Sequence, residues 1–567
     1  MKGEGKIVLL ELKVDVLVIG GGGAACRAAI EAADSGAHVL LVSKRPLRVA
    51  GATSYPVAEM AGYNAGNPQL RGDVEKHFVD MVEAGQGMAN PQLAMIVAAD
   101  APKTVETLER WGVEYEREGS GYYLFKSCFS NTARTHVIRG HGKSIAAAMV
   151  RQIELRPQIK VLDDGTVIGL LMKDGVCCGG WGYLATGERF TVHAGAVVMA
   201  TGGVSQAFQR NLNPADVTGD GYSLGFEAGA DLVNMEFMQI GMGFSHPVVN
   251  IFNGYIWAGK PTVRNAQGEA FLGRYLSAGL LAEDVMCEHR RHFPFSTSDH
   301  AMYLETSIHS EIMGGNGTEH GGVVVDLTHM TDAYVNALED DCGIHHMWPV
   351  ARDYLREKGV DPLQTPLEIC CFAHAINGGL NTDRDAMTTV PGLFAAGETA
   401  GGPHGADRLG GNMMVTCQVF GAIAGRQAAL WSMARHGEKQ GSDPLKEEKE
   451  CLLRKNINVY SMENRLRAAT QRHLLVNRSA AGMEEVLALV RTLEEEIAAA
   501  ETGDGRRIEN FGLRSQLQSV GLIAHAALRR KESRGSHHRL DYPQKDEKYN
   551  APYVINRRQA EFRGWRL

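Results

Sequence analysis

The sequence predicts an α/β fold that begins with a Rossmann-type βαβ unit. Residues Val14–Ile19 are a short apolar run with β-branched side chains, which is typical of a buried parallel strand. A Gly-rich turn follows, and the Ala-rich segment Arg27–Ser35 then predicts a helix that ends at Gly36. His38–Val42 predicts the second strand, so roughly 30 residues complete one βαβ unit.

The pattern changes twice further along the chain. Residues 160–200 alternate short strands with turns, and the βα pattern returns at Gly392–Ala396. Between these segments, residues from about 245 to 350 carry few such signals and predict an inserted domain. From about residue 435 the sequence is charged and helical, as at Glu484–Ala499, and predicts a separate helical region at the C-terminal end.

Length, charge and cysteine content limit the function classes. The 567 residues exceed one compact core, and the net charge of -8 argues against a nucleic-acid partner or an anionic membrane surface. No signal peptide precedes the first strand, and no run reaches the roughly 18 apolar residues of a membrane helix.

The ten cysteines form no C-x-x-C pair, which predicts reduced thiols in a cytoplasmic protein and no iron–sulfur cluster. No metal site is expected. His289 and His292 have a metal-like spacing, but a solvated helix face explains them better.

The turn after the first strand fits the pattern G-x-G-x-x-A. Gly20 permits the tight turn, Gly22 lets the backbone approach a pyrophosphate, and the small Ala25 lets the helix pack on the strand. The amino-terminal end of the helix then faces the phosphates. The turn is expected to bind a dinucleotide through Gly20, Gly22, Gly23, Ala24 and Ala25.

The residues after the second strand argue against NAD as that dinucleotide, because Ser43 and Lys44 stand where an NAD site usually carries an acid for the ribose. Two later segments favour FAD instead. Glu398 ends a strand that runs into glycine, and its carboxylate can accept hydrogen bonds from ribityl hydroxyls. Another strand leads into a turn that would bring backbone close to the same cofactor, at Ala200, Thr201 and Gly202.

With these segments and several longer motifs, the chain resembles the flavoprotein subunits of succinate dehydrogenase and fumarate reductase. The family also includes L-aspartate oxidase and, more distantly, adenylylsulfate reductase. The Ser43-Lys44 pair matches the family as well. The longer motifs are NPADVTGDG at 213–221, AGADLVNMEFMQ ending at Gln239, HGADRLGGN at 404–412 and RKESRGSHHRLDYP at 530–543.

The resemblance implies an order of domains along the chain. We expect a discontinuous Rossmann-type FAD-binding domain, an inserted α+β capping domain that closes on the substrate, and a C-terminal helical region. The expected bounds are 1–244 and 356–434 for the FAD-binding domain, 245–355 for the capping domain and 435–567 for the helical region.

The resemblance also implies roles for single residues. Asp220 matches an aspartate near the flavin, and Glu398 matches a glutamate that binds the ribityl chain. His374 and Arg408 match the residues that grip a substrate carboxylate, and an arginine fork suits a carboxylate on physical grounds too. The residues that would offer backbone to the isoalloxazine are Met413 and Met414.

One departure from the family concerns the flavin. Respiratory members attach FAD through a histidine soon after the second strand, but no histidine lies between His38 and His77 here. Tyr55 or Gly51 falls near that position. We therefore expect FAD to be bound without a covalent link.

The second departure concerns the substrate. Gly241 replaces a substrate-binding histidine, Asn253 replaces a nearby threonine, and Phe295 falls where the family has its proton-transferring arginine. The cations and histidine that could take over in catalysis are Arg290, Arg291 and His300. Aromatic side chains could line the freed space or form the core of the capping domain: Phe244, Tyr255, Trp257 and Phe295.

Together these features predict an FAD-dependent oxidoreductase. We expect it to act on a CH–CH or CH=CH unit beside a carboxylate, with a substrate other than standard fumarate. Three alternatives stay open: a soluble fumarate reductase, an oxidase resembling L-aspartate oxidase, and an electron-transfer flavoprotein that works within a complex. Each of these functions is compatible with a separate protein that donates or accepts electrons. Each is also compatible with a chain that forms oligomers.

Overall fold

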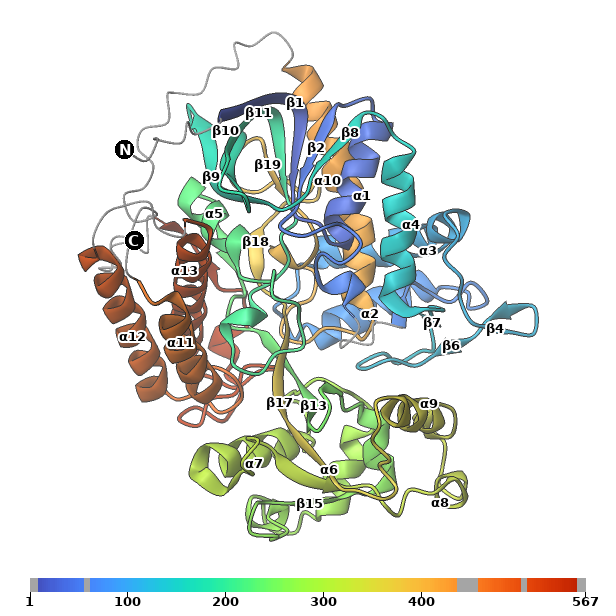
Figure 1. The fold of residues 1–567 in the computed structure, drawn as a ribbon. Helices are drawn as coiled ribbons and strands as arrows, with labels where there is room; N and C mark the ends of the chain where they lie inside the picture. Colours follow the sequence, from blue (N-terminus) through green and yellow to red (C-terminus); the bar gives the residue numbers. More distant parts are fainter. Residues whose placement is uncertain (1–8, 56–61, 436–456, 501–506, 558–567) are drawn as a thin grey trace.

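The computed structural model describes residues 9–55, 62–435, 457–500 and 507–557. A seven-stranded sheet forms the upper part of the molecule, with the order β8-β2-β1-β11-β10-β9 and with β19 beside β11 (Figure 1). Its strands are β1 (Leu9–Ile19), β2 (Val39–Val42), β8 (Ile159–Leu162), β9 (Gly165–Lys173), β10 (Val176–Leu184), β11 (Arg189–Met199) and β19 (Leu393–Ala395).

The parallel strands of this sheet end at a common edge. β1 pairs in parallel with β2 and β11, and β11 pairs in parallel with β19. The register aligns Ile19 with Met199 and Met199 with Ala395. The segments that follow these three strands therefore emerge side by side at the carboxyl edge, where open α/β sheets bind ligands.

Helices cover one face of the sheet. α1 (Gly23–Asp34) packs against α10 (Asn412–Ala434), and the two helices lie side by side in Figure 1. A Cβ on Gly425 would lie only 2.9 Å from the carbonyl carbon of Ala28, so glycine lets the two backbones approach closely. The other helices of this part are α2 (Asp73–Ala84), α3 (Pro91–Arg110) and α4 (His141–Glu154).

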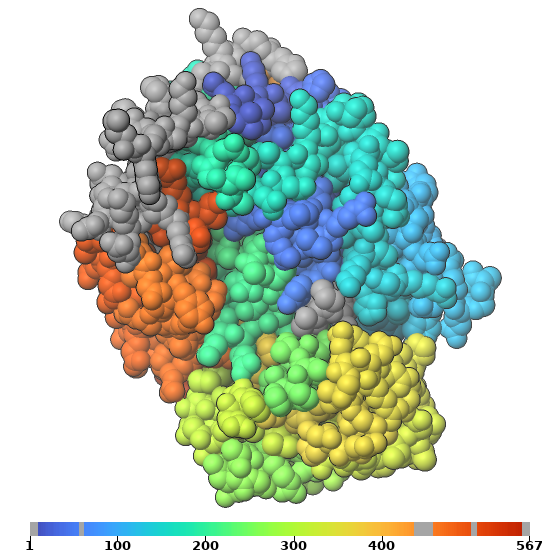
Figure 2. Space-filling model, in the orientation of Figure 1, coloured from blue at the N-terminus to red at the C-terminus, as the bar shows by residue number. Residues whose placement is uncertain are grey.

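A second lobe lies below the main sheet and contains a five-stranded sheet of order β14-β13-β17-β16-β15. The long antiparallel pair β13–β17 joins the lobe to the rest of the chain (Figure 1). Figure 2 shows the green-to-yellow residues of this lobe packed beneath the blue and cyan residues of the first half. The elements are β13 (Met238–His246), β14 (Asn250–Ile251), β15 (Thr262–Arg264), β16 (Val323–Asp326), β17 (Leu367–Ile376), α6 (Ala282–His289), α7 (Met302–Glu311), α8 (Asp332–Asn336) and α9 (Ile344–Glu357).

The other described strands form small sheets. β3, β6 and β7 form one, β4 and β5 a second, and β20-β18-β12-β21 a third. The bounds are β3 (Gly62–Asn64), β4 (Arg117–Glu118), β5 (Gly121–Tyr122), β6 (Leu124–Phe125), β7 (Thr135–Val137), β12 (Leu232–Val233), β18 (Gly379–Asn381), β20 (Ala400–Gly401) and β21 (Val554–Ile555), with α5 (Asp220–Ala228) beside β18.

The C-terminal part is a three-helix group of α11 (Val459–His473), α12 (Ala480–Ala499) and α13 (Arg507–Arg529), which packs on α5. The segment after α13 is buried and charged. Arg530 pairs with both Glu236 and Glu532, and Glu532 also pairs with Arg534. Because each buried charge has a partner, this network can hold the C-terminal segment against the core.

The fold class expected from the sequence is confirmed by this arrangement and by the solved structures reported below. The predicted βαβ unit is present, although β1 starts five residues earlier than expected and α1 starts at Gly23. Within the described ranges, no helix is both long enough and apolar enough to cross a bilayer. The nine cysteines in those ranges are free, and no group of His, Cys, Asp and Glu there could hold a metal ion.

The solvated helix face expected for His289 and His292 is wrong. Both side chains are buried, with 0% and 5% exposure. His289 Nε2 lies 2.5 Å from Glu305 Oε1, and His292 Nε2 lies 3.1 Å from Asp299 Oδ2. Burial of these rings is tolerated because each has a carboxylate partner.

Candidate active site

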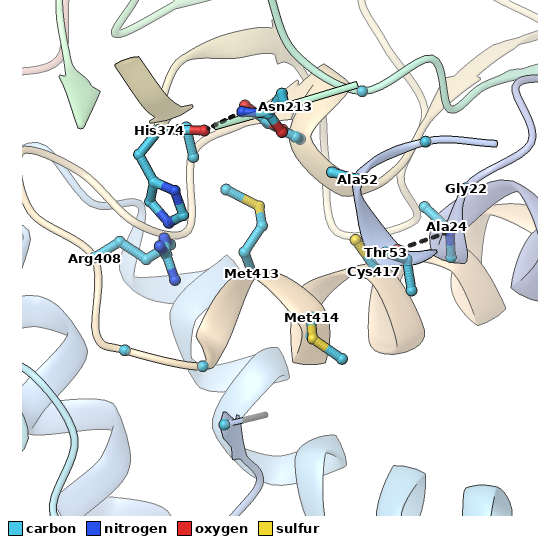
Figure 3. Close-up of a pocket in the computed structure, with 18 of the residues that line it drawn as sticks. Gly22, Ala24, Ala52, Thr53, Asn213, His374, Arg408, Met413, Met414 and Cys417 are labelled. Carbon is cyan, nitrogen blue, oxygen red and sulfur yellow. Dashed lines mark hydrogen bonds between the residues drawn. The ribbon is translucent and has the colours of Figure 1, made fainter. Parts of the chain in front are cut away.

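One cavity extends along the carboxyl edge of the main sheet. It is lined by the Gly20–Ala24 turn at one end and by His374 and Arg408 at the other. Figure 3 shows Met413 between these two groups, with Gly22, Ala24 and Thr53 on one side and the His374–Arg408 pair on the other. The cavity therefore joins a dinucleotide-type turn to a buried cation.

The glycine turn contains two glycines with different surroundings. Gly20 has φ +130°, and a Cβ there would lie 2.7 Å from the carbonyl carbon of Ala200. A Cβ on Gly22 would meet no described atom closer than the Cα of Gly51, at 3.9 Å. Gly20 is thus required by the fold, whereas the bare backbone of Gly22 faces open space at the start of α1.

Ser43 and Lys44 line the cavity beside this turn. Ser43 Oγ donates to the carbonyl oxygen of Arg45 at 2.6 Å. Lys44 forms an ion pair with Asp220, and its Nζ also donates to Thr218 Oγ1 at 2.7 Å. The lysine thus neutralises Asp220, the first residue of α5, at the wall of the cavity.

Glu398 is a partly buried residue that lines the cavity. Its Oε1 accepts a hydrogen bond from the Ile376 amide at 2.9 Å. Burial raises the pKa of Glu398 to about 7, although the amide and the Arg408 cation oppose the shift. A Cβ on Gly203 would lie 2.6 Å from the carboxyl carbon, so only glycine leaves room for this side chain.

Arg408 is the buried cation at the other end, with 6% of the residue exposed. Its Nε donates to Gln239 Oε1 at 2.8 Å and its Nη1 donates to the Leu409 carbonyl at 3.1 Å. Nη2 donates to no described residue. Burial lowers the pKa of Arg408, but a guanidinium stays charged at neutral pH. Hydrogen bonds from Nε and Nη1 hold the guanidinium in place, and Nη2 is available to a ligand.

His374 stands beside Arg408 on β17 (Figure 3). Burial lowers the pKa of His374 to about 3, and the Arg408 cation contributes to the shift, so the ring is neutral at pH 7. The buried Nδ1 has no hydrogen-bond partner among the described residues. Asn213 Nδ2 donates to the His374 carbonyl at 2.6 Å and fixes its backbone. The pair offers one cation and one neutral ring to an anionic ligand.

Phe293 forms the wall next to His374. The two rings meet edge to face, with centroids 5.5 Å apart and an interplanar angle of 90°. A Cβ on Gly241 would lie 2.6 Å from Phe293 Cε1, so the phenyl ring fills the space over this glycine. Phe293 lines the cavity and Gly241 does not.

The structure brings together most of the side chains expected at the site. These residues line the cavity: Gly20, Gly22, Gly23, Ala24, Ser43, Lys44, Ala200, Thr201, Gly202, Asp220, Asn253, Arg290, Arg291, His374, Glu398, Arg408, Met413 and Met414. Ala25 is fully buried behind the turn, as expected for a residue that lets helix and strand pack.

Several other residues lie elsewhere. His300 is outside the cavity lining: its side chain is more than half exposed, and its Nδ1 lies 3.1 Å from Glu288 Oε1. Of the four aromatic residues, Tyr255 lines the cavity, whereas Phe244, Trp257 and Phe295 belong to the buried core. Gly51 lines the cavity near the turn, and Tyr55 does not.

Some lining residues were missed in the sequence. Thr53 Oγ1 accepts the Gly23 amide at 3.2 Å, and Asp216 Oδ2 accepts the Gly51 amide at 2.8 Å. Asp216 stands inside the NPADVTGDG motif, which could have indicated it. Phe293 had no such signal, because nothing in its local pattern separates a cavity wall from a core residue.

The residues around the turn fit FAD. The Gly22 backbone is bare, the amino-terminal end of α1 faces the cavity, and the carboxyl group of Glu398 lines the same cavity. In addition, the buried Asp216 Oδ1 has no hydrogen-bond partner among the described residues. The fold and this site define the class: an FAD-dependent flavoprotein.

Comparisons with known proteins agree. Residues 15–414 match the FAD binding domain family, and residues 463–562 match the fumarate reductase flavoprotein C-terminal family. The chain therefore belongs to the fumarate reductase and succinate dehydrogenase flavoprotein family, as the resemblance in the sequence predicted.

Its relatives match over nearly the whole length. An FAD-dependent oxidoreductase of Methanocaldococcus jannaschii is 31% identical and covers 97% of this chain and 98% of its own. A fumarate reductase (CoM/CoB) subunit of Methanothermobacter marburgensis is 30% identical, over 96% of this chain and 97% of its own. The structure of Mycobacterium smegmatis Sdh1 with UQ1 superposes with a TM-score of 0.81 at 27% identity and covers 96% of this chain and 94% of its own.

Proposed function

We propose that this FAD-dependent oxidoreductase transfers a hydride between the flavin and a carbon–carbon unit next to a substrate carboxylate. The observation that carries the proposal is Arg408, a buried guanidinium with two arms held by the protein and the third directed to no described residue. The name of the fumarate reductase relative, 30% identical to this chain, supports reduction of a C=C bond.

Arg408 and His374 have complementary roles in this proposal. The guanidinium binds the carboxylate through charge-assisted hydrogen bonds and withdraws electron density from the adjacent double bond. The neutral His374 adds a hydrogen bond without a second charge. Reduction adds one hydride and one proton across C=C, and bound FAD in its reduced form supplies the hydride and its two electrons from N5.

The proton requires a donor on the other side of the substrate. Arg290 and Arg291 come from the second lobe and line the cavity, and we propose that one of them delivers the proton. Arg290 is already paired with Asp341, at 2.6 Å, whereas Arg291 has no described ion-pair partner. His300 is not part of this proposal because it lies outside the cavity lining.

For the cofactor, we propose that FAD is held without a covalent link by the lining residues of the turn and of its neighbours. The Gly20–Ala24 turn and the Ala200–Gly202 turn would contact the pyrophosphate region, Glu398 the ribityl chain, and the Met413–Met414 backbone the isoalloxazine. The absence of histidine from residues 39–76 of the sequence supports this mode of binding.

We further propose domain bounds, a location and a partner. We keep the predicted bounds at 244/245, 355/356 and 434/435. The last coincides with the end of α10 at Ala434, whereas the first falls within β13 and the second within α9. The free cysteines among the described residues support a cytoplasmic location. The relative from Methanothermobacter marburgensis is named as one subunit of its enzyme, which supports a separate protein that exchanges electrons with this chain.

The experiment that tests the proposal removes the cationic grip. Arg408→Ala and Arg408→Lys proteins, loaded with FAD and reduced without oxygen, are mixed with fumarate or monomethyl fumarate while flavin reoxidation is followed at 450 nm. Loss of a buried, doubly held carboxylate partner costs roughly 3–5 kcal/mol, so Arg408→Ala should slow reoxidation by a factor of at least about 100. The lysine variant should lie between, because it keeps the charge but loses the fork.

Arg139→Ala is the matched control, because Arg139 is an exposed arginine paired with Glu116 away from the cavity. All variants should retain the flavin spectrum. Wild-type turnover in Arg408→Ala would remove this residue from the reaction, and reoxidation by air alone would favour an oxidase.

A further inference from the structure

The substrate end of the cavity carries very little free positive charge. Of the buried cationic side chains that line it, His292 is already committed: its Nδ1 faces the Pro294 carbonyl at 2.8 Å, and its Nε2 faces Asp299 at 3.1 Å. Both partners are acceptors, so both ring nitrogens are engaged as donors. Burial opposes that charge, but Asp299 outweighs it and raises the pKa of His292.

The remaining cations of this wall are either exposed or already paired with a carboxylate. Lys126 and Arg291 line the cavity but are exposed. Arg290 is mostly buried and its Nε has no hydrogen-bond partner among the described residues, but its Nη2 pairs with Asp341. In the described chain, Arg408 is therefore the buried cation of this end that keeps a donor for a ligand and forms no ion pair with a carboxylate. A second carboxylate held deep in the cavity would meet only cations that are exposed or already neutralised.

The wall next to His374 is apolar instead. The Phe293 ring covers Gly241 and rests on a small buried cluster formed by Leu212, Ile251, Cys370 and Phe372. The Phe293 amide donates to Cys128 Sγ at 3.0 Å, which fixes the backbone at this position. The ring itself packs against this cluster and meets His374 edge to face.

Neighbouring side chains extend this apolar surface. Tyr255 lines the cavity with its ring, and its hydroxyl donates to the Met347 carbonyl at 3.4 Å. Ile251 and Met347 also line the cavity. An uncharged substituent fits this surface, whereas an unpaired carboxylate buried there would be strongly disfavoured.

We infer that the substrate carries a single carboxylate, bound by Arg408 and His374, and an uncharged apolar group at the far end of its carbon–carbon unit, packed on Phe293. This inference rests on the proposed function and adds the substrate class to it. Phe293 then determines specificity, because its ring stands where a polar side chain could otherwise grip a second carboxylate.

Fumarate and its monomethyl ester form a matched pair for the test. Both have a double bond next to one carboxylate, and the other end is a second carboxylate in fumarate and an uncharged methyl ester in the monoester. The ester also activates the double bond more strongly, and this intrinsic difference cancels when the preference is compared between variants. The FAD-loaded protein is reduced without oxygen, and the second-order rate of flavin reoxidation is measured with each compound. The wild type should prefer monomethyl fumarate by a factor on the order of 100, since burial of an unpaired carboxylate is strongly unfavourable.

Two substitutions of one residue test the origin of that preference. Phe293→Leu keeps the wall apolar and should retain the preference for the ester. Phe293→His places a hydrogen-bond donor in the same space and should reduce the preference by a factor of at least about 10. Phe295→Leu controls for the loss of an aromatic ring, because Phe295 is fully buried outside the cavity lining.

The possible outcomes separate the two proposals. If fumarate reacts as fast as the ester or faster, the single-carboxylate inference is wrong while the proposed function stands. If Phe293→His and Phe293→Leu show the same preference, Phe293 does not set specificity. If neither compound accelerates reoxidation in the wild type, the proposed function fails and the inference fails with it.

Discussion

Gly20 and Gly22, two residues apart, should separate folding from cofactor binding. A methyl group on Gly22 would meet no described protein atom closer than 3.9 Å, and its φ of -81° with ψ of -172° is an extended backbone that alanine adopts freely. Since no described residue crowds this position, the neighbour that such a methyl group should disturb is a bound cofactor. Gly22→Ala should therefore leave the apoprotein intact and weaken FAD binding.

The size of the effect follows from what the methyl group displaces. In the apoprotein, alanine at a compatible position changes the free energy of unfolding by less than about 1 kcal/mol and can raise it. In the complex, the methyl group would hold the pyrophosphate away from the start of α1. Losing one or two charge-assisted hydrogen bonds, each worth about 1.5–3 kcal/mol, gives roughly 3 kcal/mol, or a Kd about 100-fold higher.

Gly20→Ala supplies the contrasting variant. Its φ of +130° is a conformation that alanine rarely adopts, and its Cβ would collide with Ala200 in the next strand-end turn. This substitution should destabilise the fold itself by several kcal/mol, on the order of a severe core mutation.

The assays are urea unfolding of the apoproteins by circular dichroism and titration of FAD by quenching of its fluorescence. If the Gly22→Ala protein binds FAD with a Kd within threefold of the wild-type value, the assignment of this turn to the pyrophosphate is refuted. Unfolding of the Gly22→Ala apoprotein at clearly lower urea would refute the claim that the fold tolerates a side chain there.

Two further predictions concern the flavin, beside those made above for Arg408 and Phe293. In the proposed binding mode, ribityl hydroxyls would donate to ionised Glu398, so binding would release a proton and FAD affinity should rise as the pH increases through about 7. Glu398→Gln should bind FAD several-fold more weakly at pH 8 and show no such rise in titrations at pH 6 and pH 8; an unchanged pH dependence would place the titrating group elsewhere. Acid precipitation should release the yellow colour into the supernatant, and colour retained in the protein pellet would demonstrate a covalent link.

The sequence could predict the flavin half of the site because its signals are local. A strand, a glycine turn and a helix follow one another within a few residues, and Gly20, Ala200 and Glu398 each stand at or just after the end of a strand. Parallel strands in one sheet bring such turns to the same edge. The three short segments could therefore be predicted to meet without any knowledge of the rest of the fold, and most of the residues predicted to bind the cofactor line one cavity.

The substrate half could not be predicted in the same way, because it depends on contacts across the two lobes. Phe295 was expected at the arginine position, yet it is buried in the core, while Phe293 two residues earlier lines the cavity. His300 lies a few residues further along and contacts Glu288. Within such an irregular segment no hydrophobic period exists, so the sequence does not say which side chain faces inward.

The flavin and substrate halves are not the only division in the site: the Arg408 loop and the wall that carries Phe293 are held by different parts of the chain. The loop that carries Arg408 is fixed by the C-terminal segment, where the Ser536 amide donates to the Ala406 carbonyl at 3.3 Å, and by Gln239. Such a grip suits any substrate with one carboxylate, so it determines the chemistry rather than the choice of substrate.

The wall next to His374 comes from the short segment 290–294, which reaches the cavity from the second lobe. A single substitution there changes what the cavity accepts at the far end, without touching the flavin turn or Arg408. If this division of labour is correct, changes at Phe293 should alter the ratio of rates for two substrates, whereas changes at Arg408 should lower both rates together. The comparison of these two patterns distinguishes a specificity wall from a catalytic grip.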